Sequence, residues 1–95
     1  MKKIKEIKIK YWNIINKKTK KNEENLVFYG ETFNDLLNLL FKKYQNNLKE
    51  YFLDSDGKNL SPNIIVFINN KPVRDLKFKL KDQDEILIMP NIAGG

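Results

Sequence analysis

The chain has 95 residues, of which 41% are hydrophobic and 32% charged, so it is neither a disordered chain nor a membrane protein and holds one modest core. It contains no cysteine and no histidine, which excludes disulfides, thiol nucleophiles, zinc-finger ligand sets and an imidazole general base. The formal net charge of +6 comes almost wholly from lysine, with Arg74 as the only arginine. Phosphate recognition favours arginine among interleaved aromatics, so this excess of lysine indicates a solvated surface before it indicates a nucleic-acid-binding module.

The N-terminal third predicts a β-hairpin. Every second residue from Ile7 to Tyr11 is apolar, while the alternate phase carries Lys8, Lys10 and Trp12, which is typical of a half-buried strand. Residues 16–25 contain no apolar side chain and are rich in Asn and Lys, so they predict a solvated hairpin loop. Residues 26–30 then form the second strand, which ends at Gly30.

The first residues are basic, but charged side chains from Lys5 to Lys10 interrupt any apolar signal-peptide core. No apolar run approaches the length of a membrane span. We therefore expect a cytoplasmic protein.

Residues 31–52 predict the main helix. Thr32 can serve as its N-cap, and Asp35 places an acid in the first turn. One face is apolar at helical spacing and consists of Phe33, Leu36, Leu37, Leu40 and Tyr44. Residues 53–63 gather turn formers and predict a loop, with a short helical turn before it.

The C-terminal half predicts two further central strands. Residues 63–69 and 86–90 are apolar on both phases, as strands covered on two sides are. Residues 69–73 predict a tight turn, after which Pro72 indicates an edge position. Residues 76–85 alternate briefly and end in an acidic turn.

One amphipathic helix can cover only one face of such a sheet. The phase expected to face the helix consists of Ile7, Ile9, Ile64, Val66, Ile68, Ile86 and Ile88. The opposite phase carries Trp12, Ile65, Phe67, Leu87 and Met89, and an exposed apolar set of this kind predicts a partner surface. For Trp12 two interpretations stay open, an interface anchor on this face or a side chain buried through a strand bulge.

With this order of elements, the chain resembles the ubiquitin-like β-grasp sulfur carriers, most closely the small subunit of molybdopterin synthase. The features that carry the resemblance are the acidic turn Asp82 to Glu85, the apolar strand after it, Pro90, the step Ile92-Ala93 and the terminal Gly94-Gly95. Many small subunits have a second proline where this chain has Asn91. The resemblance implies an α+β fold, a β-grasp mixed sheet of four or five strands packed on one main helix, as a single domain over residues 1–95 with a flexible tail over residues 90–95.

The resemblance also implies a chemistry for the tail. The carboxylate of Gly95 would be adenylated with ATP by a separate ubiquitin-activating-type enzyme. Sulfide from the persulfide of a sulfur donor such as a cysteine desulfurase would then displace AMP and leave a thiocarboxylate. The chain itself would be a non-catalytic sulfur-donor subunit with no bound cofactor, and its four glycines form no phosphate-binding loop. Gly94 and Gly95 also suit the tail physically, because only glycine leaves the backbone thin and flexible enough to thread a narrow channel.

The partner implied first is the large subunit of molybdopterin synthase, which would bind the pterin precursor and supply the catalytic side chains. In the resembling subunits, positions matching Trp12, Pro72 and Met89 help to dock that partner. Strand phase adds Phe67 and Leu87, and the engulfed tail adds Ile92 and Ala93.

Alternative sulfur-carrier pathways remain open, for thiamine, tRNA thiolation or a tungsten cofactor, as does a ubiquitin-like protein modifier. A basic nucleic-acid-binding module without tail chemistry ranks below them. We expect no metal site, because Asp82, Asp84 and Glu85 are typical of a solvated turn, and Asp54 and Asp56 lack the remaining ligand spacing of a calcium loop.

Overall fold

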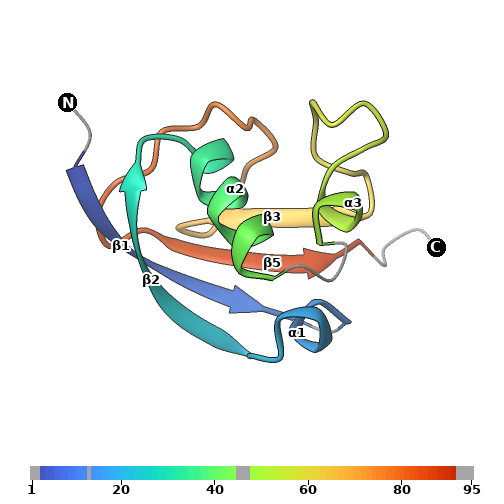
Figure 1. Cartoon of the computed structure of the whole chain (residues 1–95), viewed down its shortest axis with the longest axis horizontal. Coiled ribbons are helices and arrows are strands. Elements are labelled where there is room, and N and C mark those ends of the chain that lie inside the picture. Colours follow the sequence, from blue (N-terminus) through green and yellow to red (C-terminus); the bar gives the residue numbers. More distant parts are fainter. Residues whose placement is uncertain (1–2, 13, 45–47, 92–95) are drawn as a thin grey trace.

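A five-stranded mixed sheet carries one main helix across one of its faces (Figure 1). The computed structural model describes residues 3–12, 14–44 and 48–91, and of Lys3, Ile14, Asn16 and Lys18 it describes the backbone alone. The elements in chain order are β1 (Lys3–Tyr11), α1 (Ile14–Thr19), β2 (Glu23–Gly30), α2 (Phe33–Lys43), α3 (Leu48–Phe52), β3 (Ile64–Ile68), β4 (Lys71–Pro72) and β5 (Glu85–Pro90).

The strand order in the sheet is β2-β1-β5-β3-β4. The two central strands, β1 and β5, run parallel, whereas β1–β2, β3–β5 and β3–β4 are antiparallel pairs. The predicted α+β β-grasp fold is confirmed, with five strands and α2 as its main helix.

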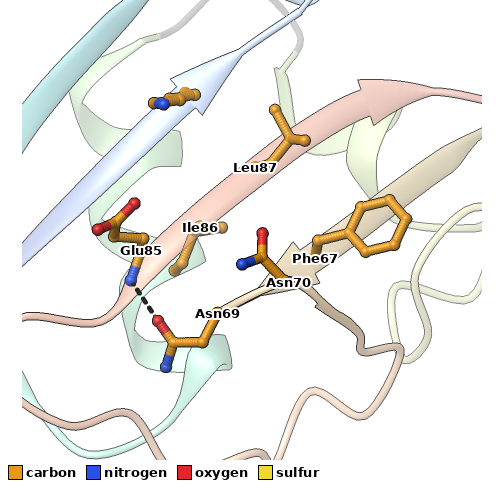
Figure 2. Close-up of a pocket in the computed structure, with 7 residues that line it drawn as sticks. Phe67, Asn69, Asn70, Glu85, Ile86 and Leu87 are labelled. Atoms are coloured by element: carbon orange, nitrogen blue, oxygen red, sulfur yellow. Dashed lines mark hydrogen bonds between the residues drawn. The ribbon is translucent and has the colours of Figure 1, made fainter.

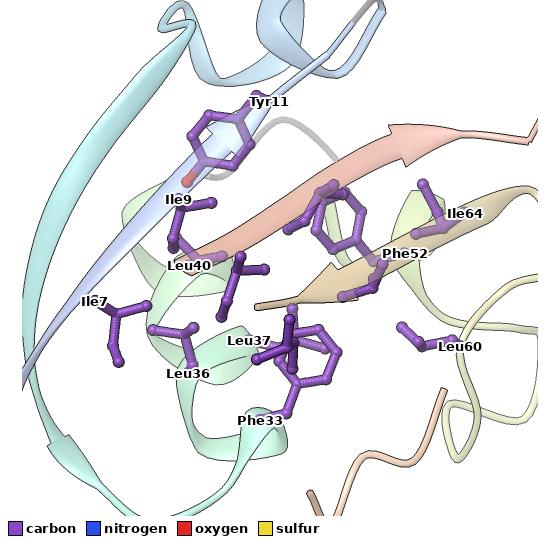
Figure 3. Close-up of a cluster of buried hydrophobic side chains, with 14 of the residues drawn as sticks. Ile7, Ile9, Tyr11, Phe33, Leu36, Leu37, Leu40, Phe52, Leu60 and Ile64 are labelled. Carbon is purple, nitrogen blue, oxygen red and sulfur yellow. The ribbon is translucent and has the colours of Figure 1, made fainter. Parts of the chain in front are cut away.

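Alternation along the strands separates a buried face from an outer face, as predicted. Ile7, Ile9 and Tyr11 are buried in one cluster with the apolar residues of α2 (Figure 3). The alternate residues Ile64, Val66 and Ile68 of β3 and Ile86 and Ile88 of β5 join the same core. The side chain of Trp12 is 52% exposed, so the interpretation that a bulge buries it is wrong.

The helix α2 begins where the sequence predicts, with a capping box. The Oγ1 atom of Thr32 accepts a 3.2 Å hydrogen bond from the Asp35 N–H, and the Asp35 carboxylate accepts a 3.0 Å bond from the Thr32 N–H. Phe33, Leu36, Leu37 and Leu40 form its buried face. Tyr44, predicted as the last member of that face, is the half-buried C-cap residue and lies outside the helix.

The prediction of a solvated hairpin loop over residues 16–25 is wrong. Residues 14–19 form α1, which ends before Lys20 (φ 61°), and β2 begins at Glu23. The reason is tertiary: Ile15 and Thr19 are buried, and the Thr19 hydroxyl donates to the Lys21 carbonyl at 3.1 Å. The burial of Ile15 and Thr19 thus orders a segment that has little apolar character of its own.

The second half of the chain follows the predicted elements. The main helix predicted over residues 31–52 is shorter, because α2 ends at Lys43 with Tyr44 as its C-cap. Residues 48–52 form the separate helix α3, which is the short helical turn expected before the 53–63 loop. Asn69 and Asn70 make the tight turn with φ of 52° and 69°, a conformation that Asn tolerates better than most residues, and Pro72 lies in the edge strand β4. None of the helices in the described residues combines the length and apolar character of a membrane span.

The acidic turn differs from the expected solvated loop. Asp84 is only 7% exposed, and its carboxylate accepts hydrogen bonds from Asn69 Nδ2 at 2.8 Å and from the Lys81 N–H at 2.7 Å. The Asp82 carboxylate accepts the Glu6 N–H at 2.8 Å. The two acids tie the start of β5 to β1 and to the β3–β4 turn, and the bonds to Asp84 supply the donors that a buried carboxylate needs.

Candidate partner surface and tail base

The face of the sheet that lies opposite α2 carries an apolar patch. We define the outer patch as the side chains of Trp12, Ile65, Phe67, Leu87 and Met89. Ile65 pairs with Met89 and Phe67 with Leu87 across β3 and β5, and directly opposed residues share a face. Ile65, Phe67, Leu87 and Met89 are each half-buried, so part of every one of these apolar side chains is open to solvent on this face.

Trp12 lies at the β1 side of the outer patch, and Pro72 extends the patch at the β4 side. The Trp12 N–H donates to the Ile88 carbonyl at 3.0 Å, so Trp12 continues β1 alongside β5, one residue beyond the Tyr11–Ile88 pair and next to Met89. Pro72 is exposed and pairs with Phe67 across β3 and β4. The structure thus brings together five of the residues predicted for partner binding: Trp12, Phe67, Pro72, Leu87 and Met89.

A small pocket lies beside the outer patch at the turn end of β3. It has a volume of about 210 Å³ and is lined by Lys10, Phe67, Asn69, Asn70, Glu85, Ile86 and Leu87 (Figure 2). Its floor is fixed, because the Asn69 and Glu85 backbones bond at 2.8 Å and the Glu85 N–H also donates to Asn69 Oδ1 at 3.0 Å. Apolar and charged groups therefore lie within reach of one partner side chain. The outward phase of Lys10 and the tight turn at residues 69–73 were signals in the sequence, whereas the hydrogen bonds that join this turn to Glu85 were not.

Ile4, Val27 and Tyr29 form a second set of exposed apolar side chains, at the other end of β1 and β2. Ile4 pairs with Tyr29 and Glu6 with Val27. This set was missed because residues before Ile7 were not included in the predicted strand. The period-two phase of Val27 and Tyr29 could have revealed it.

The base of the C-terminal tail is tied to the sheet. Pro90 pairs with Ile64 and is the last residue of β5, as predicted. The tail does not leave the sheet there, however, because the Asn91 N–H donates to the Asn63 carbonyl at 2.8 Å. Successive N–H groups of a strand point to opposite sides. The Asn91 N–H points to the β3 side, so an N–H group at Pro90 would point to the β1 side. The strand β1 has already ended at Tyr11, so a proline is tolerated at this position.

The predicted reactive and tail-binding residues Ile92, Ala93, Gly94 and Gly95 lie outside the described residues. Within the described part of the chain, no group of three acidic side chains is placed to hold a metal ion. Asp54 and Asp56 share one turn, where their mutual hydrogen bond lowers the pKa of Asp54.

Comparison with known proteins decides what kind of β-grasp protein this is. The sequence matches the ThiS family over residues 9–95. The chain belongs to the ThiS family. It is a ubiquitin-like β-grasp sulfur carrier, and sulfur carriers of this family work with partner enzymes.

Solved structures support the same assignment of fold. Small archaeal modifier protein 1 from Methanosarcina acetivorans is 31% identical over 98% of this chain and 99% of its own, with a TM-score of 0.78. A Pyrococcus furiosus protein assigned as molybdopterin converting factor subunit 1 is 21% identical over 93% of this chain and 99% of its own, with a TM-score of 0.70. CysO of Amycolatopsis orientalis, solved in complex with BexX, is 22% identical over 94% of this chain and 99% of that chain, with a TM-score of 0.74. A search of curated proteins finds no match.

Proposed function

We propose that this ThiS-family carrier bears sulfur as a thiocarboxylate on Gly95 and donates it for molybdopterin synthesis, as the small subunit of molybdopterin synthase. The observation that carries the proposal is the family match, which runs through Gly94 and Gly95. The likeness in fold to the Pyrococcus furiosus converting-factor subunit agrees with it.

In this proposal the catalytic groups belong to partners. An adenylating enzyme uses ATP to convert the Gly95 carboxylate into a mixed anhydride with AMP, which is the step that makes a poor electrophile reactive. A sulfur donor such as a cysteine desulfurase then supplies the sulfur. The proposal needs no cofactor on the chain itself, since the ATP is used by the adenylating enzyme. Gly30 ends β2 and Gly57 lies in the 53–63 loop, and neither position has the glycine-rich spacing of a phosphate-binding loop.

Docking to the large subunit would use the outer patch together with Pro72. Aromatic and sulfur-containing side chains such as Trp12, Phe67 and Met89 are the types that protein interfaces favour at their cores. Lys10 and Glu85 beside the patch would fix the register of the partner by charge. Ile92 and Ala93 would lead the two glycines into the partner's active site.

Intact-mass spectrometry of the protein purified from its own host tests the thiocarboxylate. A gain of about 16 Da, the difference between sulfur and oxygen, is expected on the full chain. A variant that lacks Gly95, expressed in parallel, should show no such gain. Conversion of a pterin precursor to molybdopterin by the thiocarboxylated chain and the large subunit then tests the pathway.

The 31% identity with small archaeal modifier protein 1 favours a second candidate, conjugation to other proteins through the same tail. The last lysine or arginine is Lys81, so trypsin would leave residues 82–95 attached to each target lysine. Mass spectrometry of host proteins for lysines that carry this peptide separates a modifier from a dedicated sulfur donor.

A further inference from the structure

Asn91 makes two hydrogen bonds with a single turn of the chain. Its backbone N–H donates to the Asn63 carbonyl at 2.8 Å, and its side-chain Nδ2 donates to the Pro62 carbonyl at 3.2 Å. The two acceptors are consecutive, so the pair fixes both the position and the rotation of the backbone at Asn91. A proline at this position could make neither bond, because it has no N–H and no side-chain donor.

The turn that accepts these bonds is itself held firmly from two sides. On the helix side, the buried Ser61 donates its N–H to the Phe52 carbonyl at 2.8 Å, and its Oγ atom accepts the Asn63 N–H at 3.1 Å. The turn therefore connects the end of α3 with the base of the tail.

The guanidinium of Arg74 holds the other side of the turn. It donates to the Ile64 carbonyl at 2.9 Å through Nη1, and to the Leu60 and Ser61 carbonyls at 2.9 Å and 3.0 Å through Nη2. The planar fork of an arginine suits such a set of carbonyls, and lysine could not replace it. The only arginine of the chain is thus used to brace the segment against which Asn91 is fixed.

We propose that Asn91 is a positioning residue for the tail. Its two hydrogen bonds fix the backbone at the base of the tail against the Pro62–Asn63 turn, and Arg74 braces that turn. The proposal rests on the proposed function of Gly95. Only four residues follow Asn91, and four residues reach at most about 13 to 14 Å, so the orientation of Asn91 decides which volume the Gly95 carboxylate can sample. A fixed base reduces the conformational entropy that an activating enzyme must remove when it takes up the tail.

Amide hydrogen exchange tests the fixed base directly. The Asn91 N–H should exchange at least about ten times more slowly than in an unstructured peptide, since it is bonded to a braced carbonyl. Asn91→Ala, which removes the Nδ2 donor alone, and Arg74→Ala, which releases the turn, should each lower that protection. Asn38→Ala changes the same residue type on the exposed side of α2 and should leave it unchanged. An unprotected Asn91 N–H in the wild-type chain would overturn the proposal.

Kinetics of adenylation test the positioning role. The assay follows pyrophosphate release by the adenylating enzyme of the same organism, with this chain as the varied substrate. Asn91→Ala and Asn91→Asp should raise KM about five-fold, as the loss of one hydrogen bond predicts, with kcat unchanged because the tail and its carboxylate are intact. Asn38→Ala should have no effect. An unchanged or lower KM for both Asn91 variants, with melting temperatures equal to wild type, would contradict the proposal.

The double variant separates a shared mechanism from two independent ones. If Asn91 acts through the turn that Arg74 braces, the KM effects of Asn91→Ala and Arg74→Ala combine to less than their product. Full multiplicativity would contradict the coupling. Failure of the wild-type chain to be adenylated at all would defeat the proposed function of Gly95, while the exchange of the Asn91 N–H would still decide whether the base of the tail is fixed.

Discussion

The phenol of Tyr11 in β1 donates a 2.8 Å hydrogen bond to the carboxylate of Glu24 in β2. The same carboxylate accepts hydrogen bonds from the phenol of Tyr44 and from the Lys43 ammonium, the latter at 2.7 Å, and Lys21 lies 3.3 Å away. The Glu24 side chain is 6% exposed. One carboxylate therefore joins the hairpin to the C-terminal end of α2.

We expect this cluster to make stability depend on pH at the acidic end. Burial alone would raise the pKa of Glu24, but hydrogen bonds from Lys43, Tyr44 and Tyr11 outweigh it and hold that pKa at about 2. A carboxyl whose pKa is lower in the folded than in the unfolded state stabilises the fold at a pH above its ordinary value near 4.5, and loses that contribution as the pH falls towards 2. After allowance for solvent screening, the free energy of unfolding should drop by about 1 to 2 kcal/mol over that range. Urea titrations at several pH values measure it.

Glu24→Gln provides the control for that titration, because the amide keeps the shape and removes the charge. The variant should be less stable near neutral pH by about 1 to 3 kcal/mol and should have a shallower acid dependence than the wild type. An unchanged slope between pH 5 and pH 2 would show that other carboxyls set the acid limit. Burial and the bond to Glu24 both raise the pKa of Tyr11, so its phenol keeps its proton throughout.

Gly30→Ala should destabilise the fold for a steric reason. A Cβ atom at Gly30 would lie 2.7 Å from Phe28 Cε2 and 2.9 Å from Asp35 Cβ, which is closer than real Cβ contacts allow. Asp35 cannot shift freely because it closes the capping box with Thr32. The expected loss is about 1 to 3 kcal/mol, read as a fall in melting temperature. Gly57 (φ 71°) is the control, because nothing lies within 4 Å of a Cβ atom added there and Asn tolerates this backbone conformation. Gly57→Asn should therefore change the melting temperature little. Equal losses for Gly30→Ala and Gly57→Asn would contradict the steric account.

Local patterns predicted much of the fold. The period-two phase of β1 was enough to separate Ile7 from Trp12, because alternate residues of a strand always face opposite sides. The start of α2 was equally predictable, since Thr32 and Asp35 act on each other within one turn. The outer patch followed from the same phase once a single helix had to cover the other face.

Features that depend on distant contacts were not predictable. The helix α1 exists because Ile15 and Thr19 meet a core built by other segments. The hydrogen bond from Asn91 ends on Pro62, 29 residues earlier in the chain, and no local pattern relates the two. Of the candidate site, the strand residues could therefore be predicted, whereas the fixing of the tail base required the tertiary structure.

Trp12→Asp or Met89→Asp should weaken binding to the proposed partner, the large subunit of molybdopterin synthase. Either change leaves a charge in the desolvated core of the proposed interface, at an expected loss of at least about 1 kcal/mol in binding free energy. Folding should survive, because Trp12 is exposed and Met89 half-buried. Titration calorimetry measures the affinity, and Asn38→Asp adds the same charge on the exposed side of α2 as a control. Unchanged affinity in a folded Trp12→Asp variant would mean that the partner binds elsewhere.

Changes at Gly95 should abolish sulfur loading without affecting the fold. Deletion removes the reacting carboxylate, and each residue appended after Gly95 moves the carboxylate by about 3 to 4 Å from the activated phosphate. Gly94→Val should reduce loading as well, because a β-branched side chain restricts the backbone and thickens the tail where a partner must close around it.

The assay for the tail variants mixes each with the activating enzyme, ATP and a sulfur donor, and follows the thiocarboxylate by mass. The buried residues of the described core all precede Asn91, so we expect circular dichroism and melting temperature to match the wild type. The melting curves therefore serve as the internal control, because loss of loading in a chain with an unchanged melting temperature must arise in the tail itself. Normal thiocarboxylate formation by a chain extended beyond Gly95, without prior trimming, would show that the free Gly95 carboxylate is not the reacting group. In that case loading would not depend on Gly95 as the last residue, and the docking variants at Trp12 and Met89 would be the ones to lose function.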